Sequence, residues 1–223
     1  MRAKRPLERI LVAKGLGGAR VQEVIDLARQ SGTPVRFEER DALDRLASTR
    51  AHQGVIALGS AKKYAELDDV APASELIVVL DGVEDPHNLG AIVRTAHAAG
   101  AGAVVISERR AAGLTDVVAK AAAGALEYLP VVRVGNVNQA LRSLKDMGYF
   151  VYGLDERGDL AYDKVEWAER SVVVMGAEGK GLHELVRKNC DALLRIPMAG
   201  KIGSLNVSVA TGVVLFSRLS RSR

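Results

Sequence analysis

The chain has 223 residues, enough for one or two domains, and a formal net charge of +4 at pH 7. Apolar residues make up 48% of it and aromatic residues only 4%, so the core must consist mainly of Val, Leu, Ile and Ala. No apolar run is long enough to span a membrane, the single Cys190 excludes an internal disulfide, and the histidines show no metal-ligand spacing. These observations predict a cytoplasmic protein without a metal ion.

The positive charge is concentrated near the amino terminus. Residues 1–60 contain 11 Lys and Arg against 7 Asp and Glu, whereas residues 61–223 contain 20 of each. A basic segment joined to a neutral one indicates a part that binds a polyanion and a part that carries out chemistry. An ordinary solvated surface is the alternative explanation of so small an excess.

The first 59 residues predict a small α/β domain. Hydrophobic runs, helical spacing and glycine-rich turns alternate within it. The expected elements are strands over 8–14, 34–37 and 54–58, a helix that carries Val21, Val24, Ile25 and Ala28 on one face, and a short helix around Leu43 and Leu46.

Arg50, His52 and Gln53 precede the last of these strands. The guanidinium of Arg50 suits a phosphate, and the side chains of His52 and Gln53 carry donors and acceptors that suit RNA bases. We therefore expect an RNA contact here, with a purely structural histidine as the alternative.

Residues 60–75 are polar, contain a proline and predict a linker with one helical turn at most. From Leu76 onward, apolar strands and helices alternate, which predicts a mostly parallel sheet with helices on both faces over residues 76–223. We expect strands over 76–80, 103–106, 129–132, 149–154, 171–175 and 193–196, and helices over 88–99, 115–123, 137–147, 182–188 and 204–219.

The first motif of this second part is DGVEDPHNLGAIVRTA, residues 81–96, which directly follows a strand. Gly90 and the start of the helix could present backbone N–H groups to an anion, and Asn88 adds an amide. Arg94 lies among small and apolar residues, so it needs an anionic partner if it is buried. The alternative is a capped helix with a solvated arginine.

The second motif is VVVMGAEGKGL, residues 172–182, in which a strand ends at Gly176 and glycines surround Glu178. Ligands of open α/β sheets bind at the carboxyl ends of the strands, where this loop belongs. Its spacing matches neither a dinucleotide fingerprint nor a phosphate-binding P-loop.

The third motif, residues 196–216, begins with Ile-Pro, passes through two glycines and enters a run of small residues. Its polar residues Ser204, Asn206 and Ser208 alternate with apolar ones, so they either cap a helix or face a ligand. All three motifs follow strands and could converge on one pocket. Because they lack a Ser-His-Asp set, a metal cluster and a carboxylate pair, they favour group transfer by positioning over hydrolysis.

Together, these motifs resemble those of the SpoU (TrmH-like) RNA 2′-O-methyltransferases over residues 76–220. The matching residues are Asn88-Leu89-Gly90 with Arg94-Thr95-Ala96, Gly176 to Leu182, Ile196-Pro197-Met198, and Ser204 to Ala210. The segments HQGV at 52–55 and PHNLGA at 86–91 are similar to those of one branch of the family. That branch methylates a guanosine ribose of large-subunit (23S) ribosomal RNA.

The resemblance implies a SPOUT fold with a deep trefoil knot at its carboxyl end, a homodimer, and S-adenosylmethionine as cofactor. The cofactor would be held by Gly176, Ile196, Met198 and Leu205. Arg94 would act at the ribose 2′-hydroxyl, and the residues around it would be Asn88, Glu178, Ser204 and Asn206.

The amino-terminal domain departs from the family. There it usually begins with a strand and a helix that carry a Gly…Val…Glu-Ala-Leu pattern, whereas this chain opens with MRAKRPLERI. We therefore expect the first strand and helix to be missing from residues 1–59.

The sequence thus predicts an S-adenosylmethionine-dependent ribose methyltransferase. The alternatives are a transfer-RNA or antibiotic-resistance methyltransferase of the same family, and a non-catalytic assembly factor that binds ribosomal RNA. The group that takes the hydroxyl proton stays open, because a free guanidinium such as that of Arg94 holds its proton up to about pH 12. Glu178 and water are the other acceptors.

Overall fold

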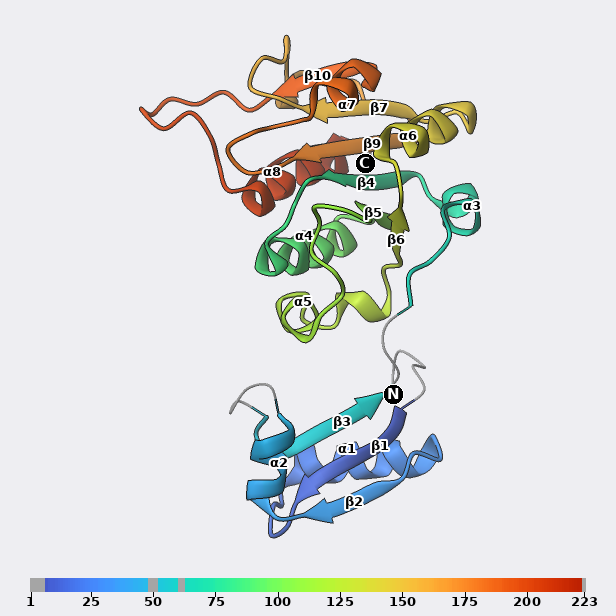
Figure 1. The fold of residues 1–223 in the computed structure, drawn as a ribbon, viewed down its shortest axis with the longest axis vertical. Coiled ribbons are helices and arrows are strands. Elements are labelled where there is room, and N and C mark those ends of the chain that lie inside the picture. Colours follow the sequence, from blue (N-terminus) through green and yellow to red (C-terminus); the bar gives the residue numbers. More distant parts are fainter. Residues whose placement is uncertain (1–6, 48–51, 60–62, 222–223) are drawn as a thin grey trace. The chain divides into compact units, whose positions relative to one another are not determined.

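The computed structural model describes residues 7–47, 52–59 and 63–221 (Figure 1). They belong to two compact units, Met1–Lys63 and Tyr64–Arg223. Residues 64–75, which the sequence assigned to the linker, are part of the second unit: α3, Leu67–Val70, lies there, and Ala65 bridges to Val132 of the sheet.

The first unit is a three-stranded sheet with two helices. Its elements are β1 (Leu7–Ala13), α1 (Ala19–Gln30), β2 (Val35–Glu38), α2 (Arg40–Leu46) and β3 (Val55–Gly59), with strand order β2-β1-β3. β1 pairs parallel with β2 and antiparallel with β3. Successive β1 side chains point to opposite faces, so Ile10 packs with Ala28 of α1 and Leu11 packs with Leu43 of α2.

The second unit is a parallel sheet of seven strands in the order β6-β5-β4-β9-β7-β10-β8. All its strand pairs are parallel, as the alternation of strands and helices predicted. The strands are β4 (Leu76–Asp81), β5 (Ala103–Ser107), β6 (Val131–Val134), β7 (Phe150–Leu154), β8 (Leu160–Ala161), β9 (Ser171–Gly176) and β10 (Ala192–Arg195). The remaining helices are α4 (Pro86–Ala98), α5 (Asp116–Ala121), α6 (Val137–Asp146), α7 (Glu184–Asn189) and α8 (Val207–Arg221).

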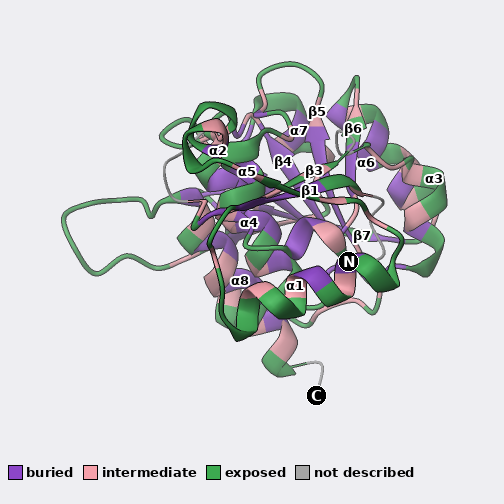
Figure 2. Cartoon of the chain, turned by 90° about the horizontal axis from the view of Figure 1, so that it is seen from below, coloured by how far each residue is buried: buried purple, intermediate pink, exposed green. Residues whose placement is uncertain are grey.

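Both faces of this sheet are covered, which gives two hydrophobic cores. Val78 and Leu80 of β4 point toward α4 and α8, whereas Ile77 and Val79 point toward α6 and α7. Each of these four side chains is at most 1% exposed. Figure 2 shows the strands β4 and β5 of this sheet as mainly buried.

Gly90 has a packing role that the sequence did not indicate. It was expected to present its N–H to an anion at the helix start, but it lies buried inside α4 against α5. A side chain there would collide with Ala121 and with the backbone carbonyl of Val118. Gly90 therefore allows two helices to approach closely.

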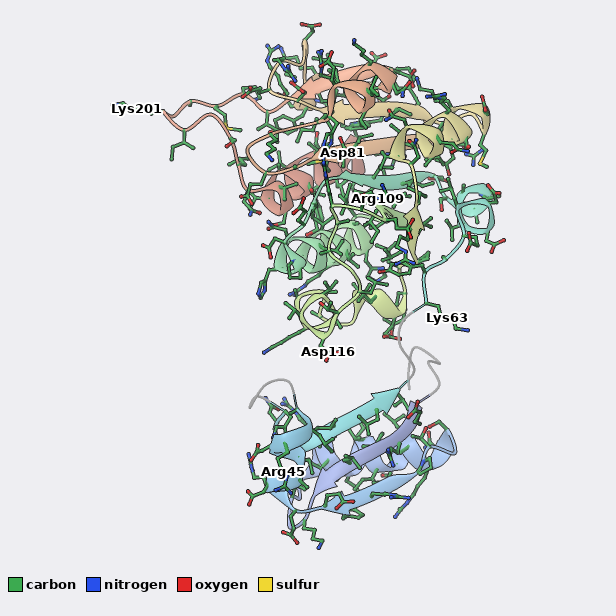
Figure 3. The ribbon with its side chains drawn as sticks, viewed as in Figure 1. Arg45, Lys63, Asp81, Arg109, Asp116 and Lys201 are labelled. Atoms are coloured by element: carbon green, nitrogen blue, oxygen red, sulfur yellow. The ribbon has the colours of Figure 1, made fainter. Side chains whose placement is uncertain are left out.

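The last helix starts later than predicted. The sequence placed its start at Ser204, but α8 begins at Val207, and residues 197–206 form an exposed loop. Lys201 lies at the outer end of this loop in Figure 3. The side-chain oxygen of Asn206 accepts the backbone N–H of Ser208 at 2.9 Å. This N–H has no partner within the helix, so Asn206 caps the first turn of α8.

Candidate functional site

The three predicted motifs meet at the carboxyl edge of the large sheet. The loops after β4, β9 and β10 leave the sheet on the same side (Figure 1). In a parallel sheet this edge is where strand ends and helix starts are brought together, so residues distant in the sequence become neighbours.

One side chain from each motif joins a single hydrogen-bonded cluster, Asn88–Glu178–Asn206. The amide of Asn88 donates to Oε2 of Glu178 at 3.3 Å. The amide of Asn206 donates to Oδ1 of Asn88 at 2.9 Å and to Oε1 of Glu178 at 3.4 Å. Both oxygens of the Glu178 carboxylate therefore accept hydrogen bonds, and its position is fixed by two amides.

A cavity of about 300 Å³, which we call the glycine-loop cavity, lies on one side of this cluster. All four residues predicted to hold a cofactor line it, together with Glu178 and Ser204 from the predicted catalytic set. The residues in question are Gly176, Glu178, Ile196, Met198, Ser204 and Leu205. Apolar walls come from Leu154, Met175 and Ala210.

Gly176 shapes this cavity because its own loop folds back against it. Ala177 and Gly181 form an isolated antiparallel bridge, which brings the far end of the loop over the strand end. A Cβ at Gly176 would lie less than 3.0 Å from backbone atoms of Gly181 and Leu182. Only glycine fits here without displacing the loop.

A second cavity of about 560 Å³, the Asn88 cavity, lies next to the first. The two share Ala177, Glu178, Lys180 and Val207 as lining residues. Asn88, Arg110 and His183 line only the Asn88 cavity. Glu178 thus faces both spaces, so a group bound in one cavity lies beside a group bound in the other.

Buried charge at the glycine-loop cavity is held by an ion pair. The side chain of Asp155, just after β7, is 2% exposed, and Arg157 donates to its two oxygens through Nε and Nη2 at 2.8 Å each. The side-chain hydrogen bonds from Arg157 hold the pKa of Asp155 below its usual value. Asp155 therefore stays ionised in the cavity wall.

Arg94 is not part of either cavity. It lies exposed on α4, and among the described residues no hydrogen bond or ion pair to it is found. Its predicted place at the ribose, with Asn88, Glu178, Ser204 and Asn206 around it, therefore stays a prediction. Its small and apolar sequence neighbours suggested that Arg94 is buried. Those neighbours lie on the buried face of α4, and Arg94 lies on the exposed face.

The predicted RNA contact in the first unit consists of Arg50, His52 and Gln53, and the structure bears on His52 in particular. Arg50 lies outside the described residues. His52 has a side chain only 5% exposed: its Nε2 pairs with Asp44 at 2.7 Å and its Nδ1 accepts the N–H of Gly54 at 3.0 Å. Both ring nitrogens are thus used within the fold, which corrects the expectation that His52 contacts a base. Gln53 is exposed.

The sequence analysis missed Asp81, Asp155 and His183. Asp81 and Asp155 each stand at the end of a buried strand, a position where an acidic residue needs a partner. That signal was present in the sequence, but it does not identify the partner. The partner of Asp81 is His183, which is 102 residues away in the chain.

Two kinds of feature are not found in the described part of the chain. No helix there is long and apolar enough to cross a bilayer. Among the same residues, no group of three or more His, Cys, Asp and Glu could hold a metal ion. The thiol of Cys190 is partly exposed, and burial raises its pKa to about 12.

Two family models match the chain, one on each unit. The model described as the SpoU rRNA Methylase family matches residues 75–216. The model described as RNA 2'-O ribose methyltransferase substrate binding matches residues 1–65. The boundary between the two matches falls close to the boundary between the two compact units.

Curated relatives are similar over both units. A putative TrmH family tRNA/rRNA methyltransferase, YacO of Bacillus subtilis, is 41% identical over 97% of this chain and 89% of its own length. The 23S rRNA (guanosine-2'-O-)-methyltransferase RlmB of Pseudomonas syringae is 42% identical over 96% of this chain and 87% of its own length.

A solved structure shares the fold. An rRNA methyltransferase of Sinorhizobium meliloti with bound AdoMet superposes with a TM-score of 0.83 at 27% identity, and the match covers 99% of this chain and 82% of that protein.

Proposed function

Because this chain belongs to the SpoU rRNA methylase family of S-adenosylmethionine-dependent RNA 2′-O-methyltransferases, we propose that its substrate is a guanosine ribose of 23S ribosomal RNA. The observation that carries the proposal is the meeting of Asn88, Glu178 and Asn206, one from each motif, between two adjoining cavities. The relative named as a 23S guanosine methyltransferase aligns over 96% of this chain, and so over both units.

The glycine-loop cavity fits the cofactor. Its apolar side chains suit an adenine ring, its carboxylate Glu178 suits a positively charged sulfonium, and the backbone around Gly176 is free of a Cβ. Gly176, Ile196, Met198 and Leu205 would hold it. When bound, S-adenosylmethionine supplies an electrophilic methyl group whose bond to sulfur breaks with both electrons remaining on sulfur.

The Asn88 cavity suits the target nucleotide. Asn88, Asn206 and Glu178 fix one another, so donors and an acceptor stand in place before a ligand binds. We assign these residues and Ser204 to holding the ribose against the methyl donor, because alignment is the main demand of the reaction.

We further propose that the working enzyme is a homodimer in which α8 and α4 meet their counterparts. Val209 and Phe216 are 53% and 47% exposed and lie seven residues apart on α8, which places them on one face. α4 packs against α8 and carries the exposed Arg94. In such a dimer, Arg94 would reach the substrate cavity of the partner subunit.

A trefoil knot at the carboxyl end is part of this proposal. After β10, which pairs with β7 and β8 near one edge of the sheet, the chain returns to pack α8 on α4 and β9.

We propose that the protein works in the cytoplasm. The proposed role of its first unit is to bind ribosomal RNA. Its excess of Lys and Arg over Asp and Glu supports this role, as does the match of residues 1–65 to the substrate-binding family. The exposed Gln53 stays a candidate contact, and so does Arg50.

Methylation mapping at nucleotide resolution tests the substrate. Ribosomal and transfer RNA from cells with and without this protein are compared for 2′-O-methyl groups. Loss of one 2′-O-methylguanosine from 23S RNA supports the proposal. Loss from transfer RNA instead would assign the chain to transfer-RNA methylation, and unchanged RNA would indicate a non-catalytic binding role.

A further inference from the structure

His183 and Asp81 form a pair at the edge of the Asn88 cavity. Asp81 ends β4 and its side chain is 7% exposed. The backbone N–H of His183 donates to its Oδ2 at 2.8 Å, and Nδ1 of the imidazole lies 2.9 Å from its Oδ1. The imidazole is 49% exposed and lines the cavity, so one of its edges is fixed by Asp81 and the other is accessible.

The carboxylate sets the tautomer of the imidazole. An ionised carboxylate only accepts hydrogen bonds, so Nδ1 must carry the hydrogen that points to Asp81. In the neutral ring, Nε2 then bears a lone pair. A carboxylate that fixes an imidazole in this way is the arrangement by which proteins orient a histidine as a general base.

The other ionisable groups around this cavity are less suited to accept a proton. Both oxygens of Glu178 already accept amide hydrogens, and Oδ1 of Asp85 accepts the N–H of His87 at the start of α4. Lys180 and Arg110 are cationic, and Glu84 is an exposed carboxylate. On α7, which begins directly after His183, Glu184 is engaged by Arg187.

We propose that His183, oriented by Asp81, is the general base of the methyl transfer; this inference rests on the proposed function. As the ribose oxygen forms its bond to the methyl carbon, its proton passes to Nε2 of His183, directly or through one water. The cationic imidazolium that results is stabilised by Asp81, and it releases the proton to solvent through its exposed edge.

His183→Asn is the variant that tests this role. The amide of asparagine can still donate toward Asp81, but the basic Nε2 is gone. In single-turnover assays with saturating RNA and cofactor, we expect the rate to fall by about 10²-fold to 10⁴-fold. The wild-type rate should depend on pH, and the His183→Asn rate should lack this dependence.

Two further readouts separate proton transfer from support of the loop. Added imidazole should restore part of the His183→Asn rate, because it supplies the missing base, whereas a damaged loop would not respond. Cofactor affinity measured by calorimetry should be unchanged. Nitrogen chemical shifts of the neutral His183 ring in the wild-type protein should show hydrogen on Nδ1 and none on Nε2.

Arg142→Ala is the control. Arg142 lies exposed on α6, which covers the opposite face of the sheet from α4 and α8, and it lines neither cavity, so its replacement should leave rate and pH profile unchanged. A His183→Asn enzyme with wild-type rate and pH profile would overturn the inference. If the wild-type protein itself transfers no methyl group to RNA ribose, the proposed function fails before this inference is reached.

Discussion

Arg94 is the predicted catalytic residue that the single subunit leaves exposed. If it acts across a dimer on the partner's ribose, its contribution is made mainly in the transition state. Arg94→Ala should then lower the single-turnover rate by about 10²-fold to 10⁴-fold, with little change in cofactor affinity. Arg94→Lys should recover little activity, because lysine keeps the charge but lacks the planar fork.

The control is Arg142→Ala on α6, a helix that covers the opposite face of the sheet from α4 and α8. Its rate should match that of the wild type. Wild-type rates in Arg94→Ala would show that this side chain is merely a solvated helix residue.

Asp155 provides a pH-dependent test of the cavity wall. Its pKa is lowered in the folded state, chiefly by hydrogen bonds from Arg157, so its stabilising effect is present above the ordinary carboxyl range near pH 4 and is lost as pH falls through the lowered pKa. We expect Asp155→Asn to reduce the free energy of unfolding by about 1–3 kcal/mol at pH 7.

Urea denaturation without cofactor, followed from pH 7 downward, measures this effect. The difference between wild type and Asp155→Asn should shrink as the pH falls below 4. A difference that stays constant over the whole range would mean that Arg157 does not stabilise the ionised carboxylate.

At the residue scale, the sequence predicted Asn88, Glu178 and Asn206 because each belongs to a motif that follows a strand. Their mutual hydrogen bonds confirm that the three motifs meet. The pairing of Asp81 with His183 could not be predicted, because it depends on which strand ends next to which helix start. The exposure of Arg94 could not be predicted for a similar reason, because helical spacing does not tell which face of α4 meets α5 and α8.

At the scale of elements, the loop between β9 and α7 depends on Gly176. A methyl group at this position would press on the backbone of Gly181 and Leu182, so Gly176→Ala should displace the loop that forms the cavity. We expect cofactor affinity to fall more than tenfold, which is about 1.4 kcal/mol.

Gly203→Ala is the control for this change. Gly203 lines the same cavity, but a Cβ there has no atom within 4 Å, so calorimetry should find nearly wild-type cofactor affinity. Unchanged affinity in a folded Gly176→Ala protein would rule out this loop as part of the cofactor site.

Strand and helix order was predictable, because apolar runs and helical periodicity are local signals. Thr115, where the sequence predicted a helix to begin, accepts the N–H of Val118 at the start of α5. The two-residue β8 was missed, since so short a strand has no pattern of its own and exists through pairing with β10. The start of α8 was placed three residues early, because small residues alone do not reveal where a cap interrupts the helix.

At the scale of the whole molecule, we expect the two units to divide the work. Residues 64–223 contain both cavities and their own core, so as an isolated fragment they should fold, dimerise and bind cofactor. RNA affinity should drop strongly without residues 1–63, and the affinity of the full chain should fall as salt rises. Filter binding with one ribosomal RNA fragment, at several salt concentrations, compares the two proteins. Equal affinity would place the RNA site entirely in the second unit.

The family, fold class and cofactor predicted from the sequence are confirmed by the family models, the parallel sheet and the AdoMet-bound neighbour. The proposed dimer could not be derived from the pattern of one chain, because an exposed apolar helix face does not identify a partner.

The position of the transferred methyl group tests the account most directly. Purified protein is incubated with ribosomal RNA that lacks the modification and with S-adenosylmethionine labelled in its methyl group, and the RNA is then digested completely to nucleosides. The account predicts label in 2′-O-methylguanosine alone; in a separate undigested sample, the linkage 3′ to this nucleotide should resist alkaline hydrolysis because the 2′-oxygen is blocked. Label in a methylated base, or no transfer to RNA by a folded protein that binds the cofactor, would contradict it.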